Sequence, residues 1–219
     1  MSVFVIVIFV LLPFPIKAEN DNSLLAGYTL TIGASAKELV LNYYRSADDS
    51  DPAGIMTEGL HYTYLLRASS PYTLRENSRW GYYFETGFSN YSLSKQNVGE
   101  DTLDLGTSVS GTYWYVTPIG FYLYGPVPGE KKELSILTGI GVGLGYLRAK
   151  GSMMLTEDGS NLLHNVDKDE IDIAASILIE AYYGHWVSRI YGGGPYTESR
   201  QDAYSIVNFS WDVGYTFVF

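Results

Sequence analysis

The chain has 219 residues, among them 23 Gly and 20 Tyr but no Cys, and 46% of its residues are hydrophobic while 17% are charged. This length fits one domain, and the charged fraction lies below the roughly 25% usual in soluble globular proteins. The formal net charge of −10 argues against nucleic acid as a partner, which requires a basic face, and the lack of Cys excludes disulfides and thiolate metal sites.

Residues 1–18 have the pattern of a secretory signal peptide. Residues 3–16 are almost entirely apolar, but the run is shorter than the roughly 20 residues of a membrane-spanning helix and contains Pro13 and Pro15. A polar segment follows Ala18. We therefore expect cleavage after Ala18, an exported protein, and a mature domain of residues 19–219.

The remainder of the chain repeats the two-residue period of β-strands. At the odd-numbered positions from 205 to 219, seven of eight residues are apolar or aromatic, whereas the even-numbered positions are mostly small or polar. The same alternation recurs upstream and predicts eight strands, near residues 27–45, 55–68, 79–93, 102–117, 134–148, 171–184, 187–193 and 204–219. Residues 118–124 could extend the fourth strand past Pro118. Ten strands is the less favoured count.

These strands are longer than the five or six residues typical of soluble sheets, and their aromatic residues concentrate toward the strand ends. Unpaired backbone groups are costly in a bilayer, so a membrane sheet must close on itself. We therefore predict an all-β protein, an eight-stranded antiparallel transmembrane up-and-down barrel. Apolar residues, including Val109, Tyr113 and Tyr115, are expected to face lipid, and polar residues to fill the interior.

The connections differ in composition. Segments 46–54, 94–101, 149–170 and 194–203 are acidic and polar, which suits the outer face, while 69–78, 118–133 and 185–186 are expected on the periplasmic side. Carboxylates gather in two of the outer segments at Asp48, Asp49, Asp51, Glu157, Asp158, Asp167, Asp169 and Glu170. Such clusters can bind divalent cations, but no EF-hand spacing is present and solvated loop charge is the favoured explanation, so no metal or cofactor site is predicted.

The carboxyl-terminal strand carries the most specific pattern. Residues 211–219 alternate aromatic side chains and end on Phe, and in this respect the chain resembles the small eight-stranded outer-membrane proteins of Gram-negative bacteria, the group of OmpX, OmpW and the OmpA membrane domain. The resemblance implies that Trp211, Tyr215, Phe217 and Phe219 form the signal read by the barrel-assembly machinery.

The same resemblance implies a location in the bacterial outer membrane and a non-enzymatic structural or surface-interaction role. Implied partners are outer-membrane lipid and lipopolysaccharide, periplasmic chaperones, and an extracellular ligand or host surface. The chain is expected to be a monomer.

An eight-stranded barrel has an interior that side chains fill, and buried charges inside it must be paired. Five charged residues fall on interior positions of the predicted strands: Arg67, Glu85, Glu180, Arg189 and Asp212. Glu180 and Arg189 flank one turn and should lie opposite each other. We interpret the five as a structural charge network, with a narrow pore for small solutes as the alternative.

The glycines at 139, 141, 143 and 145 recur every second residue and do not match the G-x-G-x-x-G spacing of nucleotide-binding loops. On one face of a strand they leave space for bulky side chains from across the interior. We interpret them as packing residues.

A lipid A-modifying barrel enzyme is the remaining alternative, because such enzymes combine His, Ser and a carboxylate in acyl transfer. The chain has three histidines, His61, His164 and His185. His185 and Ser188 resemble the pair of the lipid A deacylase family, but a three-residue spacing places them on opposite strand faces. Asp49 and Ser50 precede His61, which reverses the order of the lipid A palmitoyltransferase family.

Overall fold

The computed structural model describes residues 27–44, 53–56, 60–98, 101–103, 107–128, 132–157, 160–196 and 203–219. The predicted signal peptide, residues 1–18, lies outside the described residues, as do Asp48, Asp49, Ser50, Asp51 and Asp158. No helix in the described part of the chain is long and apolar enough to cross a membrane.

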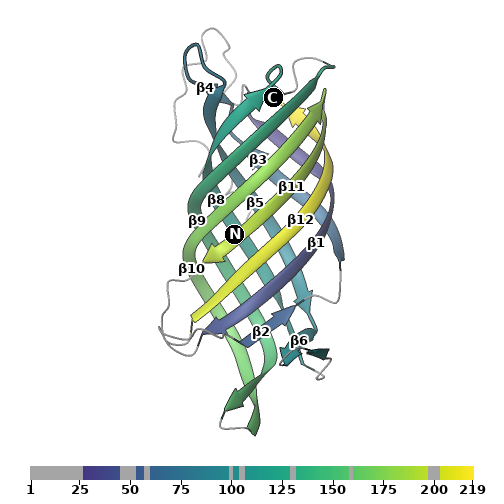
Figure 1. The fold of residues 1–219 in the computed structure, drawn as a ribbon, viewed down its shortest axis with the longest axis vertical. Helices are drawn as coiled ribbons and strands as arrows, with labels where there is room; N and C mark the ends of the chain where they lie inside the picture. The colour runs from purple at the N-terminus through teal and green to yellow at the C-terminus, as the bar shows by residue number, and fades with distance from the viewer. Residues whose placement is uncertain are drawn as a thin grey trace.

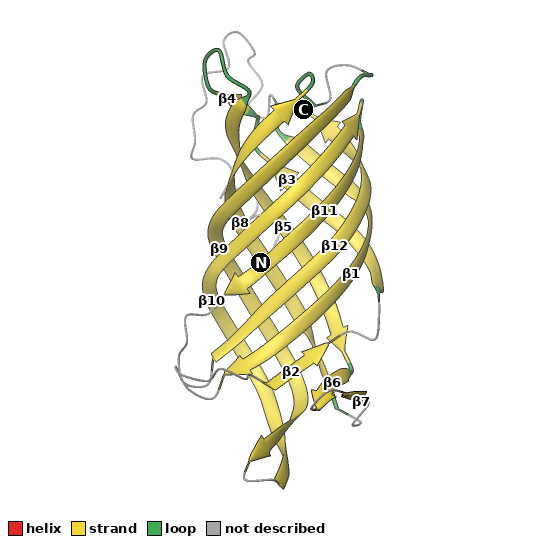
Figure 2. Ribbon diagram, viewed as in Figure 1, coloured by secondary structure: helices red, strands yellow, loops and turns green. Residues whose placement is uncertain are grey.

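Eight long antiparallel strands of the described residues form a closed ring (Figures 1 and 2). In ring order they are β1 (Thr29–Tyr44), β3 (His61–Ser69), β5 (Trp80–Leu93), β8 (Ser108–Tyr124), β9 (Leu134–Glu157), β10 (Ser160–Tyr183), β11 (Trp186–Tyr196) and β12 (Ala203–Val218). The first and last strands close the ring in a continuous register from Thr29↔Val218 to Tyr44↔Ala203. The prediction of an eight-stranded antiparallel up-and-down barrel is therefore confirmed.

Short strands lie at both ends of the barrel. At the end where β12 finishes, here called the terminal end, β4 (Thr73–Leu74) pairs with β5. At the opposite end, here called the loop end, β2 (Ala53–Met56) pairs with β1 and with β6 (Lys95–Val98), which in turn pairs with β7 (Asp101–Leu103). The prediction of one strand over 55–68 is thus wrong, because β2 ends at Met56 and β3 begins at His61, with Leu60 outside both strands. In the same way, β6 and β7 occupy part of the predicted loop 94–101.

The strands β9 and β10 continue far into the segment 149–170, which was predicted as a loop. Their ladder runs without interruption from Tyr183↔Leu134 to Ser160↔Glu157 and makes a hairpin that projects beyond the other strands at the loop end (Figure 1). The prediction failed because the inward positions Met153, Leu155 and Val166 stay apolar and buried while outward positions such as Lys150, Asn165 and Asp167 are polar. The alternation therefore keeps its two-residue period, but here apolar residues face the interior and polar residues face outward.

The fourth strand of the ring also passes the predicted end at residue 117, and the predicted turn 118–133 is correspondingly shorter. Pro118 is paired with Phe84 of β5, while the ladder to β9 skips Thr117 and Pro118 and resumes at Ile119↔Gly141. Proline lacks the N–H that a ladder needs, so the strand tolerates it where one neighbour's pairing is interrupted.

The outer wall carries the exposed apolar side chains that the alternation predicts. On β9 these are Ile140, Val142 and Leu144, which are 60–67% exposed, and the outward positions of β10, β11 and β12 repeat the pattern. For β8 the predicted orientation is wrong. Val109, Tyr113 and Tyr115 of β8 point inward and are at most 8% exposed, because tyrosine can fill an interior while its hydroxyl donates a hydrogen bond to a polar partner.

The interior is not uniformly polar, contrary to the prediction. An apolar cluster fills the loop half of the barrel, with members on β1, β8, β9 and β12 that include Leu39, Leu41, Val109, Leu147 and Ile206. A smaller cluster lies in the terminal half and includes Ile119, Phe121, Leu137 and Leu178. The barrel therefore has a packed core of its own as well as an apolar outer surface.

The alternating glycines of β9 serve packing, as their spacing predicts. A Cβ at Gly141 would lie 2.5 Å from Thr117 Cγ2 and 2.6 Å from Ile119 Cδ1, and one at Gly139 would lie 2.8 Å from Ile119 Cγ2. The neighbouring strand thus fills the space that these glycines leave, and larger side chains would overpack it.

Candidate functional site

Four charged side chains meet inside the barrel from four different strands. Arg67 comes from β3, Glu85 from β5, Glu180 from β10 and Arg189 from β11, and none of the four is more than 4% exposed. Each residue occupies an inward position of its strand, so the alternation of the sheet places all four in the interior. With two arginines and two glutamates, the cluster is electrically neutral.

The ion pairs of this charged cluster reach across the interior. Arg67 Nη1 donates to Glu180 Oε1 and lies 3.2 Å from Glu85 Oε2. Arg189 Nη1 donates to both carboxylate oxygens of Glu85, at 2.9 Å each, and lies 3.6 Å from Glu180 Oε1. Glu180 is directly opposite Arg189 in the β10–β11 register, the position predicted for it.

Tyrosine side chains complete the hydrogen bonding of the two carboxylates. Tyr115 donates to Glu85 at 2.8 Å, and Tyr182 donates to Glu180 at 3.0 Å. The Arg189 guanidinium lies over the Tyr191 ring, 4.5 Å from its centroid. Buried ions are tolerated when both charge and hydrogen bonds are satisfied. The charges of this cluster are paired, but Arg189 Nε and Nη2 have no hydrogen-bond partner among the described residues.

Asp212, the fifth residue of the predicted network, is buried but lies outside the ion pairs of the charged cluster. It is directly opposite Arg189 in the β11–β12 register, yet the described ion pairs of Arg189 are with Glu85 and Glu180. Its Oδ1 atom has no hydrogen-bond partner within the described part of the protein. The β11–β12 register therefore does not determine the ion-pair partner of Arg189.

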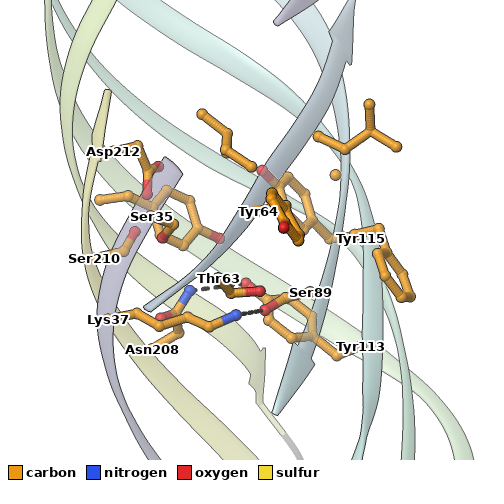
Figure 3. A pocket seen from close by; sticks show the side chains of 15 residues that line it. Ser35, Lys37, Thr63, Tyr64, Ser89, Tyr113, Tyr115, Asn208, Ser210 and Asp212 are labelled. Carbon is orange, nitrogen blue, oxygen red and sulfur yellow. Dashed lines mark hydrogen bonds between the residues drawn. The ribbon is translucent and has the colours of Figure 1, made fainter. Parts of the chain in front are cut away.

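Asp212 instead lines a small cavity on the loop side of the charged cluster (Figure 3). The cavity has a volume of about 30 Å³, enough for one or two water molecules, and Ser35, Asn208 and Ser210 also line it. Lys37 enters the same cavity and is only 2% exposed; its ammonium donates to Ser89 Oγ and, at 2.9 Å, to the Asn90 carbonyl oxygen. Sequence reasoning missed Lys37, although Ser35, Lys37 and Leu39 alternate on the inward face of β1.

Among the described residues of the enzyme alternative, His164, His185 and Ser188 each have a hydrogen-bond partner outside that set. His164 Nε2 is 2.8 Å from the Tyr204 hydroxyl, and His185 Nδ1 is 3.0 Å from the Thr216 carbonyl oxygen. Ser188 accepts a hydrogen bond from Trp211 Nε1 on the outer wall, while His61 begins β3. These contacts assemble no Ser–His pair in the part of the chain that the structure describes.

The four residues of the predicted assembly signal occupy outward positions of β12 and the residue after it. Trp211, Phe217 and Phe219 are 45–58% exposed, and Tyr215 is partly exposed, with its ring against Phe217 and Trp186. They form an aromatic ridge on the outer wall that ends at the terminal end of the barrel.

No protein-family model and no curated protein sequence matches the chain. Solved structures do match it. They include Ail, the attachment invasion locus protein of Yersinia pestis, in complex with the heparin analogue sucrose octasulfate (12% identity, 87% of this chain and 97% of that chain, TM-score 0.42). Neisserial surface protein A also matches (11% identity, 88% of this chain and 98% of that chain, TM-score 0.40). So does the outer membrane protease OmpT from Escherichia coli (8% identity, 88% of this chain and 96% of that chain, TM-score 0.39).

These similar structures are outer-membrane β-barrels of Gram-negative bacteria, the class that the sequence resembles. At such low identities and TM-scores they give no information on activity or ligand. The eight-stranded barrel fold of this chain follows from its own strand pairing.

Proposed function

We propose that this chain is a non-enzymatic outer-membrane barrel whose role is binding at the cell surface. The observation that carries the proposal is the β9–β10 hairpin. β8 accompanies β9 only as far as Ser152, and β11 accompanies β10 only from Ile173 onward. Among the described residues, the β10 segment from Ser160 to Asp172 therefore has ladder partners on β9 alone, and we infer that its second edge is where a partner binds.

A free strand edge binds partners by main-chain hydrogen bonding, with the flanking side chains giving specificity. Leu162 and Leu163 near the tip are 50% and 62% exposed and offer apolar contacts. Asp167 and Asp169, further along, are exposed carboxylates. An extended protein segment with basic side chains fits this edge better than a polyanion such as the heparin analogue bound by Ail.

In this proposal the apolar outer wall contacts outer-membrane lipid and lipopolysaccharide, and the loop end faces the outside of the cell. The aromatic ridge of β12 is the signal for the barrel-assembly machinery, and the chain works as a monomer. The charged cluster acts as a structural plug. The charged cluster and the apolar cluster of the loop half occupy the described interior, and the cavity beside Lys37 is small, which does not favour a pore.

The test is attachment of bacteria that express the full chain to immobilised extracellular-matrix proteins and to epithelial cells. One variant replaces residues 153–164 with Asn-Gly, joining the paired residues Ser152 and Asn165 by a tight turn. Attachment should fall to the level of cells lacking the protein. The control Ile190→Ala changes an exposed side chain of the outer wall on β11, outside the hairpin, and should attach normally.

Both variants must first shift mobility between unheated and boiled gel samples as the parent protein does. Attachment of the shortened variant at the parental level would overturn the proposal. So would an expressing strain that attaches no better than one without the protein.

A further inference from the structure

We propose that the barrel wall between β3 and β5 is a lateral gate, whose two edges separate and rejoin while the rest of the ring stays paired, and that Lys37 holds it closed. The gate is separate from the free edge of the β9–β10 hairpin, so the inference does not depend on the proposed surface binding. It concerns a movement of the wall and not a pore along the barrel axis.

The β3–β5 ladder is the shortest in the ring. It has four pairs, from Leu66↔Phe88 to Ser69↔Glu85, whereas each of the seven other ladders between neighbouring ring strands has at least eight. Local opening costs least free energy where the fewest backbone hydrogen bonds must break. We call this boundary the seam, and it is where the ring should separate.

On the loop side of the four pairs, the facing edges of the two strands are unpaired in the described structure. Residues 61–65 pair with β1 and residues 89–93 pair with β8, but no ladder joins these two segments across the seam. Pairing resumes where β2 meets β6, at Ile55↔Gln96. About five residues of each strand, a length of roughly 17 Å, thus lack a backbone ladder across the seam.

Lys37 spans the unpaired part of the seam from the inside. It lies on β1 opposite His61 of β3, and its ammonium reaches past β3 to donate to Ser89 Oγ and, at 2.9 Å, to the Asn90 carbonyl oxygen of β5 (Figure 3). The residue is only 2% exposed, so little water competes for these hydrogen bonds. Lys37 therefore connects β1 to β5 across the strand that separates them.

Two further side-chain contacts cross the seam. Thr63 donates to Asn90 Oδ1 at 2.9 Å, but this hydrogen bond is exposed, so water competes with it. Arg67 lies 3.2 Å from Glu85 Oε2 inside the charged cluster, beside the four pairs, and fixes the terminal side of the seam. The buried hydrogen bonds of Lys37 are therefore the main closure of the unpaired part.

An opening at the seam would connect the interior with the outer surface of the wall toward the loop end. The cavity described above already has lining residues on both sides of the wall, with Ser35 inside and Tyr64, which is 91% exposed, outside. On β5 the outward residues along the seam are Asn90 and Ser92, which are polar and exposed. Irregular backbone is tolerated in a membrane protein where it meets water, and these polar residues fit such a place.

The experiment is residue-resolved amide hydrogen exchange of the full chain in lipid nanodiscs. In the parent protein, the amides that donate across the four β3–β5 pairs should exchange about tenfold faster than those of the adjoining β5–β8 ladder. Lys37→Met should speed exchange at the seam by a further factor of about ten, the scale of one charge-assisted hydrogen bond, and leave the β5–β8 and β9–β10 ladders unchanged. Lys37→Arg keeps a cationic donor and should stay close to the parent protein.

Thr31→Val is the matched control. Thr31 is another buried, inward residue of β1, and its hydroxyl lies 2.9 Å from that of Thr216, across the continuous β1–β12 ladder. This variant removes a side-chain hydrogen bond where a backbone ladder is present. Exchange at the seam should therefore not change.

Cysteine labelling tests whether the opening reaches the cavity, since the chain has no native Cys. Ser35→Cys lies in the cavity lining and should react with a charged, water-soluble thiol reagent, and faster when combined with Lys37→Met. Thr117 is buried on the inward face of β8 and is not among the residues that line the cavity. Thr117→Cys should therefore stay unreactive with or without Lys37→Met.

Seam amides that exchange as slowly as those of the β5–β8 ladder in the parent protein would overturn the proposal, and this result requires no variant. A Lys37→Met protein with unchanged exchange at the seam would also overturn it. So would faster exchange in every ladder alike, which indicates global destabilisation, or equal labelling of Ser35→Cys with and without Lys37→Met.

Discussion

Glu180 lies directly opposite Arg189 in the β10–β11 ladder, but its closer ion pair is with Arg67 of β3, on another part of the barrel wall. Arg189 in turn donates to both oxygens of Glu85 on β5. The main ion pairs therefore connect strands that are not neighbours in the sheet. Side chains crossing the interior, rather than ladder partners, join the four charges.

Removing one charge from this cluster should lower the free energy of unfolding more than removing an oppositely charged pair. Glu85→Gln leaves Arg189 buried without its carboxylate, and we expect a loss of about 3–5 kcal/mol in the free energy of unfolding. The double variant Glu85→Gln/Arg189→Met should lose less than the sum of the two single variants, because both charges are then absent. Urea unfolding of the barrel in lipid vesicles measures all of these values.

The Glu180 and Arg189 pair provides the comparison, since their separation is 3.6 Å. The coupling energy between Glu180 and Arg189 should be smaller than that between Glu85 and Arg189. Equal couplings, or single variants as stable as the parent protein, would show that the charges do not act as a structural plug.

Alanine at Gly141 should destabilise the barrel by overpacking, by about 1–3 kcal/mol. The matched control is Gly120→Ala, because a Cβ there would meet only the Ile140 carbonyl oxygen, at 3.9 Å. Both glycines have ordinary backbone angles, so the comparison isolates the space available to the new methyl group. Equal unfolding free energies for the two variants would contradict the packing role of the alternating glycines.

Lysine on the outer wall should cost stability according to its depth in the membrane. Ile177 and Ile171 occupy the same face of β10 and are 61% and 72% exposed, but Ile171 lies two residues from Asp169, near the loop end. We expect Ile177→Lys to cost about 2–4 kcal/mol and Ile171→Lys about 0–1 kcal/mol in vesicles. In a soluble barrel the two substitutions would have similar, small effects, which is the outcome that would refute membrane insertion.

The alternation of the sequence predicts the ring well where outward positions face lipid and inward positions are small or polar, as on β12. It fails where one face changes its environment. Along β9 and β10 the outward face becomes polar beyond the apolar wall, so residues 149–170 resemble a loop although they continue both strands. On β8 the inward positions include Tyr113 and Tyr115, whose aromatic rings are typical of lipid-facing positions but whose hydroxyls have buried hydrogen-bond partners.

The inward position of the charged residues follows from counting along each strand, and so does the Glu180–Arg189 register. Which charges meet across the interior depends on the tilt and stagger of the strands around the ring. The stagger of the strands cannot be predicted from the alternation of the sequence. For this reason the sequence could not predict the ion pair between Arg67 and Glu180. It also placed Asp212 in a network whose described ion pairs do not include it, and it did not predict the cavity beside Lys37.

Closure of the ring by β1 and β12 is the claim on which the whole account depends, and a disulfide tests it directly. The chain has no native Cys. Ala34 and Val213 are direct partners in the β1–β12 register and are exposed on the outer wall. The variant Ala34→Cys/Val213→Cys should cross-link on oxidation and change the mobility of the boiled chain, whereas Ala34→Cys/Ile140→Cys should not. Absence of the first cross-link in folded protein, or equal cross-linking of both variants, would contradict a closed eight-stranded barrel.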